Sequence, residues 1–227
     1  MTPTSKAKII LSAAFNYSEH LLILYSGGKD SLVLCDLAHK MGFKITLLLF
    51  YLAPDLNIDN KKIEYALNKW HIHKVLKYPS SLRLNSLKEG LFCLPDKTIK
   101  KKYKFGDLID LAKKREQIDC FSCIGFKKSD SFHRHIMLKT YELEGIHRNS
   151  KRIYPLTDFR KDDILSYCTL NNIVIPSLQA INGRKSTGVT FHPTNLLYLK
   201  KYYPSDFDKL KKDFPLIEAS LHGTIEI

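Results

Sequence analysis

The chain has 227 residues, of which 44% are hydrophobic and 26% charged, a composition typical of a folded globular protein and not of a disordered one. No apolar stretch reaches the ~18 residues that a membrane-spanning helix needs, and the first ten residues lack the apolar segment of a secretory signal. Five cysteines, an odd number at irregular spacing, favour a reducing compartment over a disulfide framework. We therefore expect a cytoplasmic protein that is not associated with a membrane.

The balance of 36 basic against 23 acidic residues gives a net charge of +13, which attracts polyanions such as nucleic acid or nucleotides. The basic residues are clustered. Five lysines lie between Lys97 and Lys104, and Lys113, Lys114 and Arg115 follow. The clustering favours an anionic partner, with nucleic acid at Lys97–Lys104 as one candidate; the alternative is that these lysines are solvated and only keep the protein soluble.

The first 80 residues predict helices and strands in alternation. In chain order they are a helix over 5–16, a strand over 21–25, a helix over 31–42, a strand over 44–52, a helix over 57–73 and a strand over 74–79. The run 44–52 is apolar throughout, as in a strand that is covered on both faces. Alternating strands and helices are typical of a parallel sheet with right-handed crossover connections.

The middle of the chain is less regular. We expect residues 80–105 to form a long basic connection, partly disordered or lid-like. The following elements are predicted as a helix over 105–117, a strand over 119–126, a helix over 129–140, a short strand over 152–156, a helix over 160–172, a loop-rich stretch from Pro176 and two short amphipathic helices within 195–215. We therefore divide the chain into a main domain, 1–175, and a loop-rich, helical C-terminal extension, 176–227.

A glycine-containing loop, SGGKDS at 26–31, interrupts the apolar pattern where the strand over 21–25 ends. Two adjacent glycines adopt backbone conformations closed to larger residues, and their N–H groups can surround an anion at the start of the next helix. Lys29 adds a positive charge, and the hydroxyls of Ser26 and Ser31 add donors. Asp30 is a candidate magnesium ligand. Since ligands of open α/β sheets bind at the carboxyl ends of strands, the sequence predicts a phosphate site here.

SGGKDS resembles the pyrophosphate-binding loop of the PP-loop ATP pyrophosphatases, the adenine nucleotide alpha hydrolase superfamily. Farther along, IGFKKSDSFHR resembles a motif of the phosphoadenylyl-sulfate (PAPS) reductase-like family, as does YPLTDFRKDDILSYCTLNNIVIP. The matching residues are Gly125, Lys127, Asp130, Ser131 and Arg134 in the first segment, and Pro155, Asp162, Asp163, Tyr167 and Asn171 in the second. The resemblance covers roughly 20–176. It implies a Rossmann-like, doubly wound, mainly parallel sheet of the adenine nucleotide alpha hydrolase type.

The resemblance also implies a site and an activity. The implied nucleotide-binding residues are Tyr25, Ser26, Gly27, Gly28, Lys29, Asp30, Ser31, Gly125, Asp130 and Ser131, and the implied catalytic residues are Lys29, Asp30, Lys127 and Arg134. The nucleotide would be ATP or PAPS, with Mg²⁺ as cofactor. We expect ATP to be cleaved to AMP and pyrophosphate, so that a second substrate is adenylated or thiolated.

The chain departs from the family pattern at three places. FYLAPDLN, with Asp55, stands where an acidic-threonine-glycine turn is usual, and lysine replaces the more usual arginine at position 127. No cysteine follows Cys168, whereas a true PAPS reductase uses a redox cysteine in a C-terminal tail. Three alternatives therefore remain: a PAPS or adenylyl-sulfate reductase that uses an external thiol, a nucleic-acid modification enzyme, and a non-catalytic nucleotide-binding adaptor.

Two further groups have both a functional and a structural interpretation. Cys120 and Cys123 form a CxxC pair, but zinc needs four ligands and only the nearby His133 and His135 are candidates to complete it. A redox role for the pair is open, although a strand context favours core packing.

The tyrosines 198, 202 and 203 could stack on bases, while their helical spacing favours packing against the protein. A homo-oligomer is also possible.

Overall fold

The computed structural model describes residues 1–72, 74–175 and 189–221. The chain forms two compact units. Unit 1 comprises Met1–Leu49, Glu64–Leu76 and Ile118–Pro176, and unit 2 comprises Phe50–Ile63, Lys77–Gln117 and the described part of Ser177–Ile227. The domain boundary that we placed between 175 and 176 falls where the undescribed segment 176–188 begins, so it stays a prediction. The predicted loop-rich stretch lies largely in that segment, outside the described residues.

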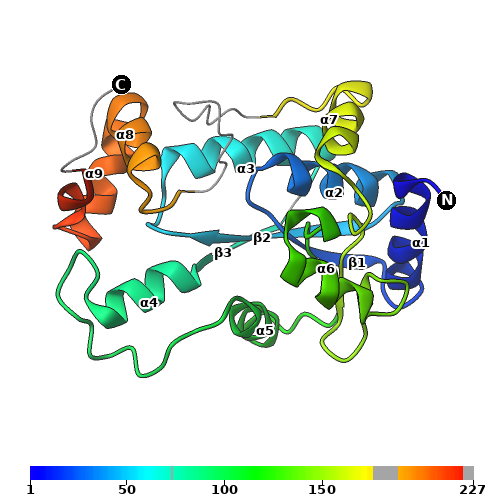
Figure 1. The fold of residues 1–227 in the computed structure, drawn as a ribbon, viewed down its shortest axis with the longest axis horizontal. Coiled ribbons are helices and arrows are strands. Elements are labelled where there is room, and N and C mark those ends of the chain that lie inside the picture. Colours follow the sequence, from blue (N-terminus) through cyan, green and yellow to red (C-terminus); the bar gives the residue numbers. More distant parts are fainter. Residues whose placement is uncertain (73, 176–188, 222–227) are drawn as a thin grey trace. The chain divides into compact units, whose positions relative to one another are not determined.

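The regular elements follow the predicted alternation (Figure 1). The strands are β1 (His20–Leu24), β2 (Lys44–Tyr51), β3 (Lys74–Pro79), β4 (Phe121–Cys123), β5 (Ile146–His147) and β6 (Arg152–Ile153). The α-helices are α1 (Pro3–Phe15), α2 (Lys29–Lys40), α3 (Asn57–Trp70), α4 (Ser81–Glu89), α5 (Phe105–Arg115), α6 (Phe132–Lys139), α7 (Lys161–Leu170), α8 (Pro193–Tyr202) and α9 (Pro204–Asp213). All the helices and strands predicted before residue 80 are confirmed within a few residues.

The sheet has the strand order β3-β2-β1-β4-β6-β5. β1 pairs in parallel with β2 and with β4, β4 pairs in parallel with β6, and β5 runs antiparallel to β6. In the register, Ile23 of β1 lies opposite Leu47 on one side and Cys123 on the other. The mainly parallel sheet of a Rossmann-like fold is therefore confirmed. Between β1 and β4 the strand order reverses direction, which is where ligands bind in such sheets.

The core of unit 1 lies around β1 and α2, where residues such as Leu22 and Leu34 are completely buried. α2 and α7 pack on each other over the same face of the sheet (Figure 1). The buried carboxylate of Asp36 on α2 accepts hydrogen bonds from Trp70 Nε1 at 3.2 Å and from Tyr167 Oη at 2.8 Å. One acidic side chain thus joins three helices, and it is also paired with Lys40 at 2.7 Å.

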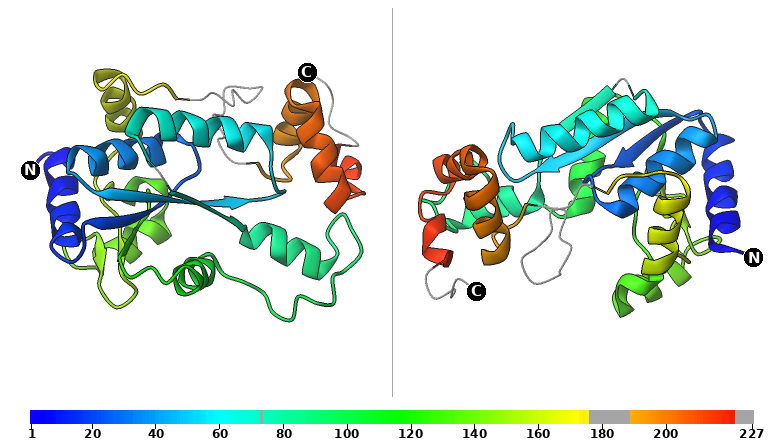
Figure 2. Two further views of the ribbon diagram at one scale, coloured as in Figure 1. Left: turned by 180° about the vertical axis from the view of Figure 1, so that it is seen from behind. Right: turned by 90° about the horizontal axis from the view of Figure 1, so that it is seen from above.

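In unit 2, α8 and α9 lie side by side and contribute to the core, as Figure 2 shows. The buried cluster consists of Leu52, Ala53, Leu56, Ile58, Leu196, Leu199, Phe207, Leu210, Phe214 and Ile217. Tyr198 and Tyr203 pack against this cluster, and the Tyr198 ring also lies 4.8 Å from that of Tyr202. For Tyr198 and Tyr203, the packing interpretation is therefore the better supported.

Our expectation of one long connection over 80–105 was wrong for its first part, where a helix lies, whereas 90–104 is a basic connection without helix or strand, as expected. α4 occupies the first part, capped by the Ser80 side chain, which accepts a hydrogen bond from the Arg83 N–H, and ended by Gly90 in the left-handed conformation. The loop that follows is held to α4: the Asn85 side chain bonds both the N–H and the carbonyl of Tyr103. The helix caps and the two hydrogen bonds from the Asn85 side chain to the backbone of Tyr103 therefore give this segment a defined conformation.

The Cys120 and Cys123 side chains are buried, and burial raises the pKa of Cys123 well above its ordinary value. These facts favour core packing over a redox role. Within the described residues no three His, Cys, Asp or Glu side chains gather as a metal site would require. None of the helices in those residues has the length and the apolar character of a membrane span.

Candidate active site

The glycine loop begins where β1 ends, at the point where the sheet order reverses. The backbone N–H of Tyr25 donates to the carbonyl of Leu48 at 2.9 Å, so the chain stays attached to β2 up to this residue. Gly27 then has a φ of +68°, a left-handed conformation that most side chains rarely adopt. Gly28 has an extended backbone and is the N-cap of α2. This geometry presents the start of α2, with its free N–H groups and positive dipole end, at the carboxyl edge of the sheet.

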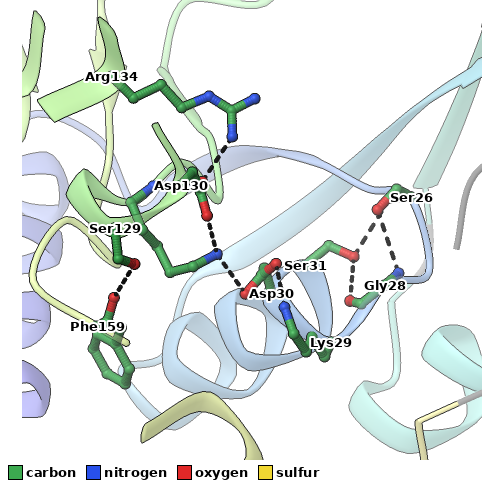
Figure 3. A network of polar contacts seen from close by, with 10 residues as sticks. Ser26, Gly28, Lys29, Asp30, Ser31, Ser129, Asp130, Arg134 and Phe159 are labelled. Atoms are coloured by element: carbon green, nitrogen blue, oxygen red, sulfur yellow. Dashed lines mark hydrogen bonds and ion pairs between the residues drawn. The ribbon is translucent and has the colours of Figure 1, made fainter. Parts of the chain in front are cut away.

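The two serine hydroxyls hold the loop in shape (Figure 3). Ser31 Oγ donates to the carbonyl of Gly28 at 2.9 Å and accepts from the N–H of Ser26 at 3.4 Å. Ser26 Oγ accepts from the N–H of Gly28 at 3.3 Å. Ser31 is buried, so its hydroxyl stabilises the loop and is not directed at a ligand, whereas Ser26 is exposed. The loop is therefore shaped before any ligand arrives.

Five charged side chains form a continuous series beside the loop, which we call the charged series. Lys29 Nζ lies 2.9 Å from Asp30 Oδ2, and Lys127 Nζ lies 2.8 Å from Asp30 Oδ1. Lys127 Nζ also lies 3.0 Å from Asp130 Oδ1, and Arg134 Nη1 lies 2.7 Å from Asp130 Oδ2 (Figure 3). Three cations alternate with two carboxylates, which leaves a net charge of +1 next to a helix N-terminus.

The members of the charged series differ in their access to a ligand. Lys127 is only 5% exposed, whereas the Arg134 side chain is 36% exposed. Burial raises the pKa of Asp130, but hydrogen bonds from the backbone and side chain of Lys127 and from Arg134 outweigh it, so the net pKa is lowered. Asp130 is therefore ionised at neutral pH and holds both basic groups in position.

Close packing between the two motifs accounts for a glycine at position 125. A Cβ added at Gly125 would lie 3.2 Å from the Cβ of Asp30, tighter than ordinary contact. Glycine at this position therefore lets the connection after β4 approach the first turn of α2 without displacing Asp30. Ser131 caps α6 by accepting a hydrogen bond from the Arg134 N–H at 3.2 Å, so its hydroxyl positions the helix.

Phe126, which we did not predict as a site residue, belongs to the site. The guanidinium carbon of Arg134 lies 3.8 Å from the centre of the Phe126 ring, a cation–π contact. Phe126 also stacks on Tyr154, with ring centres 6.1 Å apart. The ring thus supports the guanidinium next to Asp130. An aromatic residue directly after the glycine of the second motif is the signal that could have suggested this role.

Two predicted site residues, Tyr25 and Asp30, have limited access to a ligand. The side chain of Tyr25 is buried, and burial raises the pKa of its hydroxyl, so only its backbone can face a ligand. Oδ1 of Asp30 is buried and lies 2.8 Å from the ammonium group of Lys127. An oxygen that is buried against a cation is poorly accessible to Mg²⁺, so most ligands of the ion would have to come from phosphates and water. The role of Asp30 as a metal ligand stays a prediction, as does any role of Asp55, which belongs to unit 2.

A parallel sheet with this glycine loop at the reversal of its strand order defines a PP-loop nucleotide-binding fold. The chain belongs to the phosphoadenosine phosphosulfate reductase domain family, whose model matches residues 20–182. No curated protein matches the chain at a significant level.

Solved structures support the same fold. The PAPS reductase from Candida auris, in a phosphate complex, is 16% identical, with a TM-score of 0.53 over 81% of this chain and 87% of that one. The NH₃-dependent NAD synthetase from Campylobacter jejuni, in complex with nitrate, is 13% identical, with a TM-score of 0.51 over 94% and 92%. The U34-tRNA thiolase NcsA from Methanococcus maripaludis, with its [4Fe–4S] cluster, is 14% identical over 95% and 79%, but its TM-score of 0.48 is too low to support an argument.

Proposed function

We propose that this protein binds ATP at the glycine loop and cleaves it between the α and β phosphates. The adenylyl group passes to an oxygen of a second substrate, which is thereby activated for a modification such as thiolation. The observation that carries the proposal is the charged series beside the N-terminus of α2. A helix N-terminus and three fixed cations suit a chain of phosphates better than they suit a single small anion.

In the proposed reaction, the N–H groups at the start of α2 bind the β and γ phosphates. An acceptor oxygen attacks the α-phosphorus and loses its proton to solvent. The bond from that phosphorus to the bridging oxygen breaks, and pyrophosphate leaves with the electron pair. Lys29 offsets the negative charge that develops on pyrophosphate, and Arg134 holds the α-phosphate. Positioning and fixed charge supply most of the rate enhancement.

Lys127 has a more limited part in this reaction. Its ammonium group has three N–H bonds, and two of them face the carboxylates of Asp30 and Asp130. One N–H therefore remains for a phosphate oxygen. Mg²⁺, which shields phosphate charge when bound, would arrive with the nucleotide.

The cysteines favour this reaction over sulfonate reduction. All five lie in described residues, and four of them, Cys35, Cys120, Cys123 and Cys168, are buried. Burial raises the pKa of Cys168 to about 11, with the Asp30 charge adding to the rise, and burial also raises the pKa of the half-buried Cys93. Thiols of raised pKa hold little thiolate at neutral pH, so a reductase reaction would need an external thiol.

Nucleic acid is our proposal for the second substrate. The lysines between Lys97 and Lys104 are all exposed. The loop that carries them is fixed to α4, because Lys88 Nζ donates to the carbonyls of Ile99 and Lys100 at 3.0 Å each. A fixed loop that presents several ammonium groups to solvent suits a polyphosphate backbone.

The test is product analysis with ATP labelled at the α-phosphate. Water is a poor acceptor that is always present, so slow formation of AMP and pyrophosphate is expected even without the second substrate. Lys29→Ala should abolish it, whereas Lys139→Gln, an exposed lysine of α6 outside the charged series, should not. Formation of ADP and phosphate, or sulfite release from PAPS with a dithiol at a faster rate than ATP cleavage, would contradict the proposal.

A further inference from the structure

Unit 1 contains a cavity of about 450 Å³ at the edge of the sheet opposite to the glycine loop. His20, Lys44 and Lys74, which line it, are the first residues of β1, β2 and β3. The glycine loop follows the last residue of β1, so the two features lie at opposite ends of the same strand. The cavity is therefore separate from the proposed ATP site, and it lies within the range of ~300–1,000 Å³ that small-molecule pockets occupy.

The floor of the cavity is apolar and partly aromatic. It is formed by Phe43, Ile45, Trp70 and Ile72, each less than 10% exposed. The indole N–H of Trp70 is directed away to Asp36, with which it forms a 3.2 Å hydrogen bond. The ring position is therefore fixed, and the apolar part of the indole contributes to the lining. Such a floor suits a flat apolar group.

The polar lining consists mainly of lysine and histidine side chains, and its positive charge comes from the two lysines. Lys44, Lys74, His39 and His71 are exposed residues of the lining, and His20 lies deeper, with its Nε2 2.8 Å from the Thr46 hydroxyl. Burial lowers the pKa of His20, and repulsion from Lys74 and then Lys44 lowers it further.

Two acidic groups near the cavity, Glu19 and Asp36, are screened by water or paired elsewhere. Glu19 lies 3.6 Å from Lys44, but both side chains are mostly exposed, so water screens the pair. Asp36 lies behind Trp70 and is paired with Lys40 at 2.7 Å. Two lysines and three histidines thus surround an apolar floor.

We propose that this cavity binds a small organic anion with a planar apolar body and a phosphate group, the chemistry of an aryl phosphate. The planar body lies on the floor of Phe43, Trp70 and Ile72. The phosphate group contacts Lys44 and Lys74, and the histidines act as further donors. The site does not depend on the proposed ATP reaction.

Trp70 is the sole tryptophan of the chain, so fluorescence excited selectively at tryptophan, and not at the 12 tyrosines, reports on a residue that lines this cavity. The full-length protein is titrated with phenyl phosphate, with phenol and with inorganic phosphate, and free N-acetyltryptophanamide corrects for absorption and collisional quenching. Phenyl phosphate should give a saturable change and bind about tenfold more tightly than either fragment. No saturable change, or equal affinity for phenyl phosphate and phenol, would overturn the proposal.

Variants locate the site. Lys44→Gln combined with Lys74→Gln should weaken phenyl phosphate binding about tenfold or more, whereas Lys74→Arg keeps the charge and should retain the affinity. Lys139→Gln is the control for a lost surface charge, and it should bind as the wild type does. Saturating ATP should not displace phenyl phosphate, and displacement would place the probe at the glycine loop. Unchanged affinity in the double variant would also reject the site.

Discussion

Asp206 in α9 caps the N-terminus of α3, a helix that begins 149 residues earlier in the chain. Its carboxylate accepts hydrogen bonds from the backbone N–H groups of Asn57 at 2.8 Å and Ile58 at 2.9 Å, and it is completely buried. Both donors are among those that the first turn of a helix leaves without an intrahelical partner. A carboxylate there also interacts favourably with the helix dipole. The cap therefore fastens α9 to the start of α3 within unit 2.

Asp206→Ala should lower the free energy of unfolding by about 2–4 kcal/mol, because it leaves two backbone donors without their partner in a buried place. Urea denaturation followed by circular dichroism measures the loss. The matched control is Asp208→Ala, an exposed acidic residue of the same helix, which should stay within about 0.5 kcal/mol of wild type. Equal denaturation midpoints for the two variants would contradict a stabilising cap.

Lys127 should tolerate arginine but not an apolar residue. Lys127→Met leaves Asp30 and Asp130 without their shared cation, so we expect ATP affinity to fall more than about tenfold and stability to fall by about 3 kcal/mol. Lys127→Arg retains the charge and should bind ATP within about threefold of wild type. Isothermal calorimetry with a non-hydrolysable ATP analogue measures the nucleotide affinity of both Lys127 variants, with Lys139→Gln as control. Wild-type affinity in Lys127→Met would remove Lys127 from the site.

Stability in acid should depend on a second ionic group in unit 1, which consists of Lys6, Lys128, Glu144 and Asp158. Hydrogen bonds from Lys128 and then Lys6 lower the pKa of Glu144 from 4.5 to about 2. Because the folded-state pKa is depressed, Glu144 stabilises the fold fully above about pH 4.5, and this contribution is lost as the pH falls through about 2. For Asp158, burial raises the pKa, but hydrogen bonds from Lys128 and Lys6 outweigh burial and lower the net pKa. Asp158 therefore also stabilises the fold at neutral pH and loses this effect in acid.

Glu144→Gln should therefore destabilise the protein at neutral pH, and its stability should fall less than that of wild type as the pH drops from about 4.5 to about 2. Thermal denaturation across a pH series measures both effects. Glu64→Gln, which alters an exposed carboxylate outside the group, should follow the wild-type curve. Parallel curves for wild type and Glu144→Gln would show that the ionic group does not contribute.

The exposed lysines of the loop between α4 and α5 should make nucleic-acid binding salt-dependent. Each phosphate contact contributes a slope of about −0.9 to log K against log salt on duplex DNA and about −0.7 on single strands. Replacing Lys100, Lys101 and Lys102 by glutamine should make the slope shallower by roughly two to three units. Fluorescence anisotropy across a salt series measures it.

The control for that experiment removes the same charge elsewhere. Lys8, Lys139 and Lys161 are exposed lysines of unit 1, and their replacement by glutamine should leave the slope near that of wild type. If both triple variants change the slope equally, the effect is one of net charge, and the loop is not a binding surface. If neither changes it, nucleic acid is not a partner.

The sequence by itself determined the features that depend on neighbours in the chain. An apolar run followed by two glycines predicted the loop at 26–31, since a left-handed residue such as Gly27 is a local requirement. Apolar periodicity predicted α8 and α9 for the same reason. α4 was also within reach of a local argument, because Ser80 and Gly90 are ordinary capping residues, but the basic composition of the segment hid them.

Only the tertiary structure decided which distant residues meet. The pairing of Lys127 with Asp30 depends on β4 lying beside β1, and the cavity lined by His20, Lys44 and Lys74 depends on the order of three strands. The cap by Asp206 depends on how α9 packs within unit 2. Such contacts cannot be inferred from periodicity, because each is created when burial of apolar faces brings separate segments together, and many other pairings have the same local pattern.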